Sequence, residues 1–211
     1  MMKHNRDMWD KLHRKGYVGY SMNSNLSNAT ELLPKDYLNG ETKALELGCG
    51  RGDYMKKLAS SVGEVHGVDI SREAVKLAWI NMWWTPNAYP TVCNGHSLPY
   101  PDNYFDFIYE MAVFQHIPRE YTRNYLKEAY RCLKHGAFMT AQFISRVSDD
   151  ENHGDIELPN KEETIGYTLD DIRDIVADSG LSLINVETQL VDRDNVFWYK
   201  ILCVKGDIDD V

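Results

Sequence analysis

Several features that place a chain in a specialised class are missing from this sequence. Its four cysteines, Cys49, Cys93, Cys132 and Cys203, lie far apart and include no C-x-x-C pair. This spacing argues against a disulfide scaffold or a zinc site and is typical of reduced thiols. No apolar run reaches the roughly 18 residues of a membrane-spanning helix, and no apolar segment follows the basic residues near the N-terminus, as a secretion signal would require. We therefore expect a cytoplasmic protein with no membrane partner.

Positive charge is also scarce. The chain has 23 Lys and Arg against 32 Asp and Glu, which gives a formal net charge of −9. Proteins that bind a phosphate backbone cluster Lys and Arg at the contact, so the composition disfavours a nucleic-acid partner. The 211 residues are 43 % hydrophobic and show no internal repeat. This length and composition predict one globular domain over residues 1–211 with a full hydrophobic core.

The most informative stretch is a glycine-rich segment that follows a short apolar run. Residues 44–47 are predicted to form a buried strand, residues 48–52 a loop and residues 54–62 a helix. Such a loop presents backbone N–H groups at the positive end of a helix dipole, and glycine lets a ligand approach the main chain. A second apolar run over residues 65–68 ends at Asp69, where doubly wound folds place the acid that binds ribose hydroxyls. The two stretches predict a site for a nucleoside-bearing cofactor.

The details of this loop disfavour a dinucleotide. The nicotinamide fingerprint G-x-G-x-x-G requires a third glycine where this chain has Asp53, whose charge would lie near a pyrophosphate. The chain instead reads Glu46-x-Gly48-x-Gly50-x-Gly52, with an acid two residues before the first glycine. This pattern resembles the first motif of class I, Rossmann-like S-adenosylmethionine-dependent methyltransferases, and is similar to the small-molecule, type 11 branch of that family. The cofactor implied is S-adenosyl-L-methionine, with S-adenosyl-L-homocysteine as its product.

The resemblance covers residues 43–211. It implies an α/β fold with a doubly wound, mostly parallel seven-stranded sheet, helices on both faces and an antiparallel C-terminal strand pair. The expected strands are residues 44–47, 65–68, 91–93, 105–109, 137–144, 181–191 and 196–204. The expected helices are residues 7–15, 29–33, 54–62, 72–82, 121–133 and 169–179. In the first of these helices, Met8, Trp9 and Leu12 share one side.

The resemblance also implies which residues bind the cofactor. They are Tyr17, Glu46, Gly48, Cys49, Gly50, Asp69, Ile70, Asn94, Gly95, His96 and Glu110. Position 94 opens the family's next signature, residues 94–106, and usually carries an acid that accepts from the adenine amine. Asn94 can accept through its amide oxygen, more weakly. Gly95 would offer a backbone N–H to the adenine ring, and His96 would line its edge.

A segment ending in His-Ile-Pro follows the fourth strand, as it often does in small-molecule members of this family. His116 and Glu110 are the candidate catalytic residues, and Gln115 is a candidate for orienting either ligand. Histidine has the pKa to take a proton from a nucleophile, although His116 equally suits a histidine that fixes a helix start by hydrogen bonds. A sulfonium methyl is already activated, so the enzyme mainly aligns the groups for an in-line displacement. A base is needed only for an acceptor that is protonated at the working pH.

The acceptor class is narrowed by two missing motifs. The fourth strand is not followed by the Asn/Asp-Pro-Pro-aromatic motif of nucleic-acid and glutamine methylases, and no cysteine follows a proline as in cytosine C5 methylases. We therefore expect methyl transfer to an oxygen or nitrogen atom of a small metabolite. One alternative is an RNA or protein methylase guided by the basic face of helix 121–133. Another is a non-catalytic subunit that binds S-adenosylmethionine, and the sequence leaves the oligomeric state open.

Three further segments admit two interpretations each. Residues 1–40 are expected to form a helical cap in which Tyr17 and Tyr20 either cover the methionine end of the cofactor or pack in a loop. The acidic insertion at residues 146–166 either lies over the acceptor site or is a solvated loop, which we favour. Three tryptophans, at positions 79, 83 and 84, have helical spacing. Such a stripe is more often core than a stacking platform, so we assign them to the core.

Overall fold

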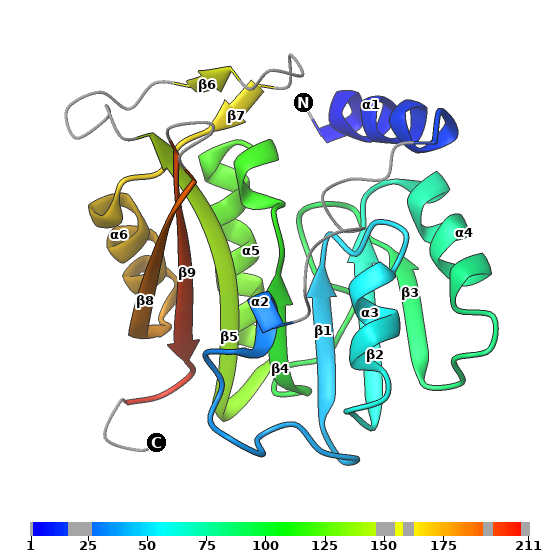
Figure 1. The fold of residues 1–211 in the computed structure, drawn as a ribbon, viewed down its shortest axis with the longest axis horizontal. Helices are drawn as coiled ribbons and strands as arrows, with labels where there is room; N and C mark the ends of the chain where they lie inside the picture. The colour runs from blue at the N-terminus through cyan, green and yellow to red at the C-terminus, as the bar shows by residue number, and fades with distance from the viewer. Residues whose placement is uncertain (1, 17–26, 147–154, 158–162, 192–195, 208–211) are drawn as a thin grey trace.

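The computed structural model describes residues 2–16, 27–146, 155–157, 163–191 and 196–207. Its main sheet has seven strands in the order β3-β2-β1-β4-β5-β9-β8 (Figure 1). The five strands β1 to β5 run parallel to one another, whereas β9 pairs antiparallel with both β5 and β8. The strand bounds are β1 Lys43–Leu47, β2 Glu64–Asp69, β3 Ala88–Val92, β4 Phe105–Glu110, β5 Leu133–Arg146, β8 Ser182–Val191 and β9 Val196–Val204. The predicted doubly wound fold class is confirmed.

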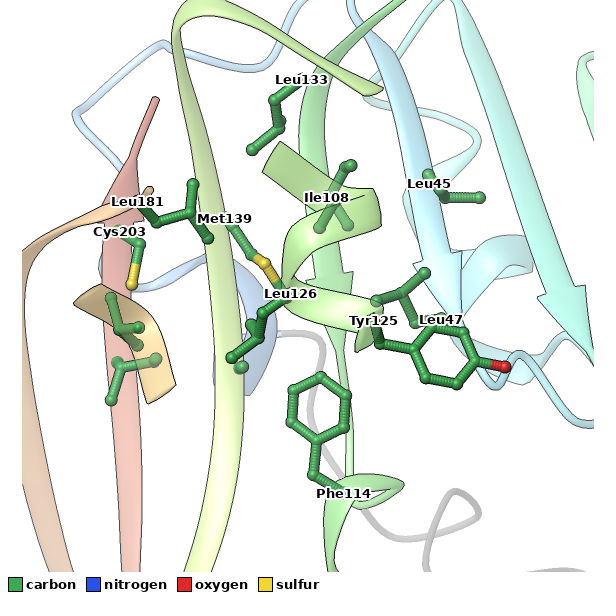
Figure 2. Packing of buried hydrophobic residues seen from close by; sticks show 14 of the residues in the cluster. Leu45, Leu47, Ile108, Phe114, Tyr125, Leu126, Leu133, Met139, Leu181 and Cys203 are labelled. Atoms are coloured by element: carbon green, nitrogen blue, oxygen red, sulfur yellow. The ribbon is translucent and has the colours of Figure 1, made fainter. Parts of the chain in front are cut away.

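Helices cover both faces of this sheet. On one face, α2 (Ser27–Thr30), α3 (Asp53–Leu58) and α4 (Arg72–Asn81) pack on a core that includes Ala29, Met55 and Ala78. On the other face lie α5 (Arg119–Cys132) and α6 (Leu169–Ser179). Figure 2 shows Leu126 of α5 beside Met139 of β5, with Phe114 below them. This second core is built from aliphatic and aromatic side chains that are almost completely buried.

Helix ends follow the capping chemistry of the sequence. The hydroxyl of Ser71 accepts from the backbone N–H of Ala74 at 3.0 Å and begins α4. Thr168 and Asp171 form a reciprocal capping box at the start of α6. Gly180 ends α6 with a φ of 88°, a left-handed conformation that favours glycine. These predicted boundaries are confirmed because local hydrogen bonds decide them.

Other boundaries depend on tertiary contacts and differ from prediction. α1 (Met2–Arg14) begins before residue 7, and α3 ends at residue 58 rather than 62. β5 begins at Leu133, directly after α5, rather than at residue 137, so Gly136 lies inside a strand. The N–H of Gly136 donates to the carbonyl of Lys205 at 2.7 Å, which joins the strand start to the chain that follows β9. Within the acidic insertion, β6 (Asp155–Glu157) pairs antiparallel with β7 (Glu163–Ile165).

The tryptophan assignment was wrong. Trp79 is 52 % exposed, Trp83 73 % and Trp84 89 %. α4 lies near the edge of the sheet and buries Ala74 and Ala78, whereas the tryptophans lie on its other side and in the turn that follows. Helical spacing alone cannot show which side of an edge helix is covered. Among the helices in the described part of the chain, none is both long and apolar enough to cross a bilayer.

Candidate active site

The carboxyl ends of β1, β2 and β4 meet where the strand order reverses. From β1 the chain proceeds to β2 and β3 on one side, and β4 and β5 lie on the other side. Leu47 pairs with Val68 of β2 and with Glu110 of β4, so the glycine loop, Asp69 and Glu110 begin at the same edge. Ligands of doubly wound sheets bind in the crevice at such a switch point.

One side of the glycine loop, residues 48–52, packs against neighbouring side chains, and its other side faces open space. Gly48, Gly50 and Gly52 have φ values of 69°, 51° and 78°. A Cβ at Gly48 would collide with the branched side chain of Val113, so packing requires glycine there. At Gly52 a Cβ would meet only the flexible end of Met82, and the positive φ is what favours glycine. A Cβ at Gly50 would meet nothing within 4 Å among the described neighbours. The open space over Gly50 is where a ligand can approach the backbone.

Asp69 ties this loop to β2. Its Oδ2 accepts from the N–H of Gly50 at 3.0 Å, and its Oδ1 accepts from the N–H of Ser71 at 2.8 Å. Burial raises the pKa of Asp69, while the two N–H donors oppose this shift. A carboxylate has about four acceptor positions, so Asp69 retains lone pairs for the hydroxyls of a ribose. The structure thus brings together Gly50 and Asp69, two of the residues predicted to bind the cofactor.

Glu46 and Cys49 lie behind the loop. Glu46 is 3 % exposed, accepts from the hydroxyl of Tyr109 at 3.0 Å, and accepts from the N–H of Met55 in the first turn of α3. Burial raises the pKa of Glu46 well above its usual value. Cys49 is buried, and its N–H donates to Val68 of β2 at 2.9 Å. Both residues make supporting contacts beneath the loop, and their expected contacts with the cofactor stay predictions.

Glu110 is also fully buried and already bonded. Its Oε1 accepts from the N–H groups of Val113 and Phe114, and its Oε2 accepts from the N–H of Gln142 at 3.0 Å. Burial raises the pKa of Glu110 to about 7. These bonds fasten the loop after β4 to β5 and turn the carboxylate toward the backbone. This geometry favours a positioning role for Glu110, and its expected contact with the cofactor or with a reacting group stays a prediction.

His116 closes the short 3₁₀ helix η2 (Phe114–His116) and lies under α1. The rings of Trp9 and His116 meet edge to face, with centroids 5.5 Å apart. Burial lowers the pKa of His116 to about 4, so its imidazole is neutral at pH 7. A group of that pKa accepts a proton poorly at neutral pH. The environment therefore favours a packing or orienting role over the predicted role as general base.

Gln115, the residue before His116, is 2 % exposed. Its Oε1 atom is buried and has no hydrogen-bond partner among the described residues, and the same holds for Nε of Arg51 in the glycine loop. Buried polar atoms without a partner are rare in native proteins and call for an explanation. Each of the two atoms is therefore a candidate contact for a bound ligand.

The 94–97 segment forms a turn whose side chains are bonded to one another. Oδ1 of Asn94 accepts from the N–H groups of His96 and Ser97 at 2.7 and 2.8 Å. The amide oxygen expected to accept from adenine is thus occupied, because it stabilises the turn. Gly95 has a φ of 80° and is buried, whereas His96 is exposed and packs against the ring of Tyr121. Gly95 remains the better candidate for an adenine contact through its backbone.

Polar side chains on α1, which the sequence analysis missed, fasten this helix over the site (Figure 1). Arg6 donates to the carbonyls of Ile70 and Cys93 at 3.0 and 3.1 Å. Oδ1 of Asp10 accepts from the Ser71 hydroxyl at 2.6 Å and from the N–H of Glu73 at 3.2 Å. The predicted apolar side is only partly used, since Met8 is 39 % exposed. A polar stripe normally indicates a solvated face, so helical spacing gave no signal for this docking.

Some predicted residues cannot be placed. Tyr17 and Tyr20 lie outside the described residues, as does most of the acidic insertion. The described strand β7 lies beside η2, at the carboxyl edge of the main sheet (Figure 1). The expected roles of these segments over the cofactor and the acceptor therefore stay predictions.

Comparison with known proteins agrees with this site. A family model described as a methyltransferase domain matches residues 45–141. A demethylmenaquinone methyltransferase of Anoxybacillus flavithermus is 37 % identical over 100 residues, which are 45 % of this chain and 41 % of that protein. The chain thus matches less than half the length of this curated relative.

Two solved structures share the fold. A SAM-dependent methyltransferase of Methanosarcina mazei has a TM-score of 0.67 and 22 % identity, covering 81 % of this chain and 95 % of that one. A putative methyltransferase of Haloferax volcanii, solved with the activator Trm112, has a TM-score of 0.70 and 16 % identity, covering 94 % and 98 %. Together with the glycine loop and Asp69 at the switch point, these matches show that residues 45–141 are similar to a methyltransferase domain and that the chain has the Rossmann-like fold of S-adenosylmethionine-dependent methyltransferases.

Proposed function

We propose that this protein transfers the methyl group of S-adenosylmethionine to an oxygen or nitrogen atom of a small molecule. The observation that carries the proposal is the pairing of Asp69 with the open glycine at position 50. The name of the curated relative, a demethylmenaquinone methyltransferase, supports an acceptor that is a small molecule rather than a macromolecule. The excess of acidic over basic residues supports the same class.

Residues at the carboxyl edge would hold the cofactor. Asp69 would accept from the ribose hydroxyls, the N–H groups of the glycine loop would face the methionine end, and the backbone of Gly95 would reach the adenine. When bound, S-adenosylmethionine supplies a methyl group already activated by its sulfonium. The residues of the chain then have to align the acceptor with that methyl group and exclude water.

The acceptor side is assigned to η2 and α1. Oε1 of Gln115 would accept from the hydroxyl or amine of the acceptor, because it is buried without a partner among the described residues. Trp9 and His116 would form an aromatic wall beside it. Glu110 holds η2 in place through the N–H groups of Val113 and Phe114. Deprotonation of the acceptor by His116 is disfavoured, so the proposal favours acceptors that are neutral or ionised without help.

Calorimetry followed by a methyl-transfer screen tests this proposal. The purified protein is titrated with S-adenosylmethionine and with S-adenosylhomocysteine. It is then incubated with radiolabelled cofactor and panels of phenols, carboxylic acids and amines. Micromolar binding of both ligands with transfer to one panel supports the proposal. Absence of binding in a folded protein contradicts the cofactor assignment, and binding without transfer to any panel favours a binding subunit.

Replacing Gln115 with leucine is expected to separate cofactor binding from transfer. The variant removes an unpaired buried acceptor and keeps a similar volume, so we expect unchanged or slightly higher thermal stability. A lost hydrogen bond to the acceptor predicts a roughly tenfold or greater fall in kcat/KM. The affinity for S-adenosylhomocysteine, measured by calorimetry, should change less than about twofold. A stable variant with normal kcat/KM would remove Gln115 from the acceptor site.

Replacing Asp10 with alanine is expected to loosen α1. The change leaves the Ser71 hydroxyl and the Glu73 N–H without their acceptor, which costs about 1–3 kcal/mol. We expect the affinity for S-adenosylmethionine to fall roughly five- to tenfold, with faster tryptic cleavage after Lys11 and Arg14. Asp7→Ala, on the exposed side of the same helix, is the matched control. Equal affinity and cleavage rates in both variants would show that α1 docking does not contribute to the site.

A further inference from the structure

An exposed apolar surface lies on α4 and the turn after it. It consists of Trp79, Ile80, Trp83 and Trp84, which we call the tryptophan patch. Their exposed fractions are 52, 64, 73 and 89 %, and the rings of Trp83 and Trp84 contact each other edge to face at 5.7 Å. Single exposed apolar residues are ordinary, but a contiguous group of this kind marks an interaction surface. α4 begins after Ser71 at the carboxyl edge, and its last turn contacts the glycine loop, since Nδ2 of Asn81 donates to the carbonyl of Arg51 at 3.3 Å. Trp79 and Ile80 are on the exposed side of that turn (Figure 1).

The charges next to the patch are basic. Lys76 precedes Trp79 and Ile80 by one helical turn and is exposed, and Arg72 is exposed one turn earlier. Lys56 of α3 donates to Oδ1 of Asn81 at 3.3 Å, which places its ammonium beside the end of α4.

Helices α3 and α4 carry one acid each, Asp53 and Glu73, against the four bases Lys56, Lys57, Arg72 and Lys76. Asp53 accepts from Asn81 at 3.0 Å, and Glu73 lies 3.7 Å from Arg14. A protein of net charge −9 therefore carries a local cationic rim around its most exposed aromatic residues.

The combination of exposed tryptophans with neighbouring basic residues favours a lipid surface over a protein partner. Tryptophan is enriched where protein meets the headgroup region of a bilayer, and flanking Lys and Arg add attraction to anionic lipids. Protein interfaces also favour tryptophan but are depleted in lysine. The three tryptophans expose on the order of 500 Å² if a fully exposed tryptophan contributes about 250 Å². That area is below the roughly 800 Å² per partner of a stable dimer.

The neighbouring sheet edge, formed by β3, is poorly suited to pairing with a strand of another molecule. The N–H of Val65 in β2 donates to the carbonyl of Asn87, and the N–H of Cys93 donates to the carbonyl of Asp69 in β2. The backbone groups of residues 87 and 93, at the two ends of β3, therefore face β2. Positions 88, 90 and 92 alternate with them and face outward, and position 90 is a proline without an N–H. Proline on an open edge blocks pairing with another strand. The patch is thus a surface for side-chain insertion rather than for sheet extension.

We propose that the tryptophan patch binds the surface of membranes that contain anionic lipids. The indole rings enter the headgroup region, and Lys56, Arg72 and Lys76 face the lipid phosphates. No membrane partner was expected from the sequence because no apolar run is long enough to span a bilayer, and that criterion does not test for a surface anchor. The tryptophans that would form such an anchor were assigned to the core, and they are exposed.

Vesicle co-sedimentation of the intact protein tests this proposal. Vesicles of phosphatidylcholine with phosphatidylglycerol are compared with vesicles of phosphatidylcholine alone, and insertion is followed by quenching of tryptophan fluorescence with brominated lipids. We expect binding to the anionic vesicles that weakens with salt. Trp83→Ser combined with Trp84→Ser should reduce the partition coefficient at least tenfold. Lys56→Gln combined with Lys76→Gln should reduce it more than the matched pair Lys35→Gln and Lys127→Gln, two exposed lysines elsewhere on the surface.

Several results would overturn the proposal. One is that the protein binds neither kind of vesicle, and another is that the tryptophan variant binds vesicles as well as the wild type does. A third contrary result is a wild-type dimer in gel filtration that the tryptophan substitutions alone abolish, which would assign the patch to a second copy of the chain. Quenching by single-stranded RNA but not by brominated lipid would assign the patch to base stacking. All variants are also titrated with S-adenosylhomocysteine. Failure of the proposed enzyme function would appear in that titration, whereas failure of the anchor would appear only with vesicles.

Discussion

Replacing Asp69 with alanine is expected to weaken the binding of S-adenosylmethionine by about 100-fold or more. Hydrogen bonds to a charged acceptor contribute about 1.5–3 kcal/mol each, and the ribose offers two hydroxyls to this carboxylate. The same substitution removes the acceptor of the Gly50 and Ser71 N–H groups. It therefore loosens the loop that presents the backbone to the cofactor. Calorimetric titration with S-adenosylmethionine and S-adenosylhomocysteine measures the loss.

Two further variants separate binding from folding. Asp69→Asn keeps the volume but turns a donor toward one of the two N–H groups, so it should lose nearly as much affinity as alanine. Asp102→Ala removes an exposed acid that pairs with Arg131 at 2.8 Å and should leave binding unchanged. Thermal melting confirms that each variant is folded. A folded Asp69→Ala protein with wild-type affinity for both ligands would refute the proposed ribose contact.

The parts of this site that the sequence predicts are those set by local chemistry. The glycine loop and Asp69 are each marked by residues that few other environments require, and the structure joins them through the Gly50 N–H. The starts of α4 and α6 follow from Ser71 and Thr168, whose hydroxyls bond to backbone three residues away. Such contacts involve neighbours in the chain, so sequence alone contains them.

The destinations of the acidic side chains could not be predicted in the same way. Glu46 lies on a strand that is covered on both faces. The alternation of side chains along the strand shows which face Glu46 is on, but it does not show that its partners there are Tyr109 and the first turn of α3. Glu110 stands at the strand end expected for a reactive acid, yet its partners include Gln142, 32 residues later. The polar face of α1 and the exposure of the tryptophan patch likewise depend on packing between distant segments. These features were decided by tertiary contacts.

Glu110 and His116 are expected to oppose each other in the pH dependence of stability. The pKa of Glu110 is raised from 4.5 to about 7 in the folded protein. Its contribution to the unfolding free energy is therefore complete below pH 4.5 and is lost as the pH rises through 7, by about 3 kcal/mol. The pKa of His116 is lowered from 6.5 to about 4, so its contribution is complete above pH 6.5 and is lost as the pH falls through 4, by a similar amount. Between these pH limits the two contributions to the pH dependence of the unfolding free energy cancel.

Variants that remove one group should expose the slope of the other. Glu110→Gln is expected to give a protein whose unfolding free energy, relative to wild type, rises by about 3 kcal/mol from pH 4.5 to 7. His116→Asn is expected to give the opposite trend, a relative fall of similar size between pH 4 and 6.5. Urea denaturation at steps across this range measures both, and other titrating groups such as Glu46 and His66 cancel in the comparison with wild type. Differences that do not vary with pH would show that neither side chain is buried as the structure has it, and would reopen the role of His116 as a general base.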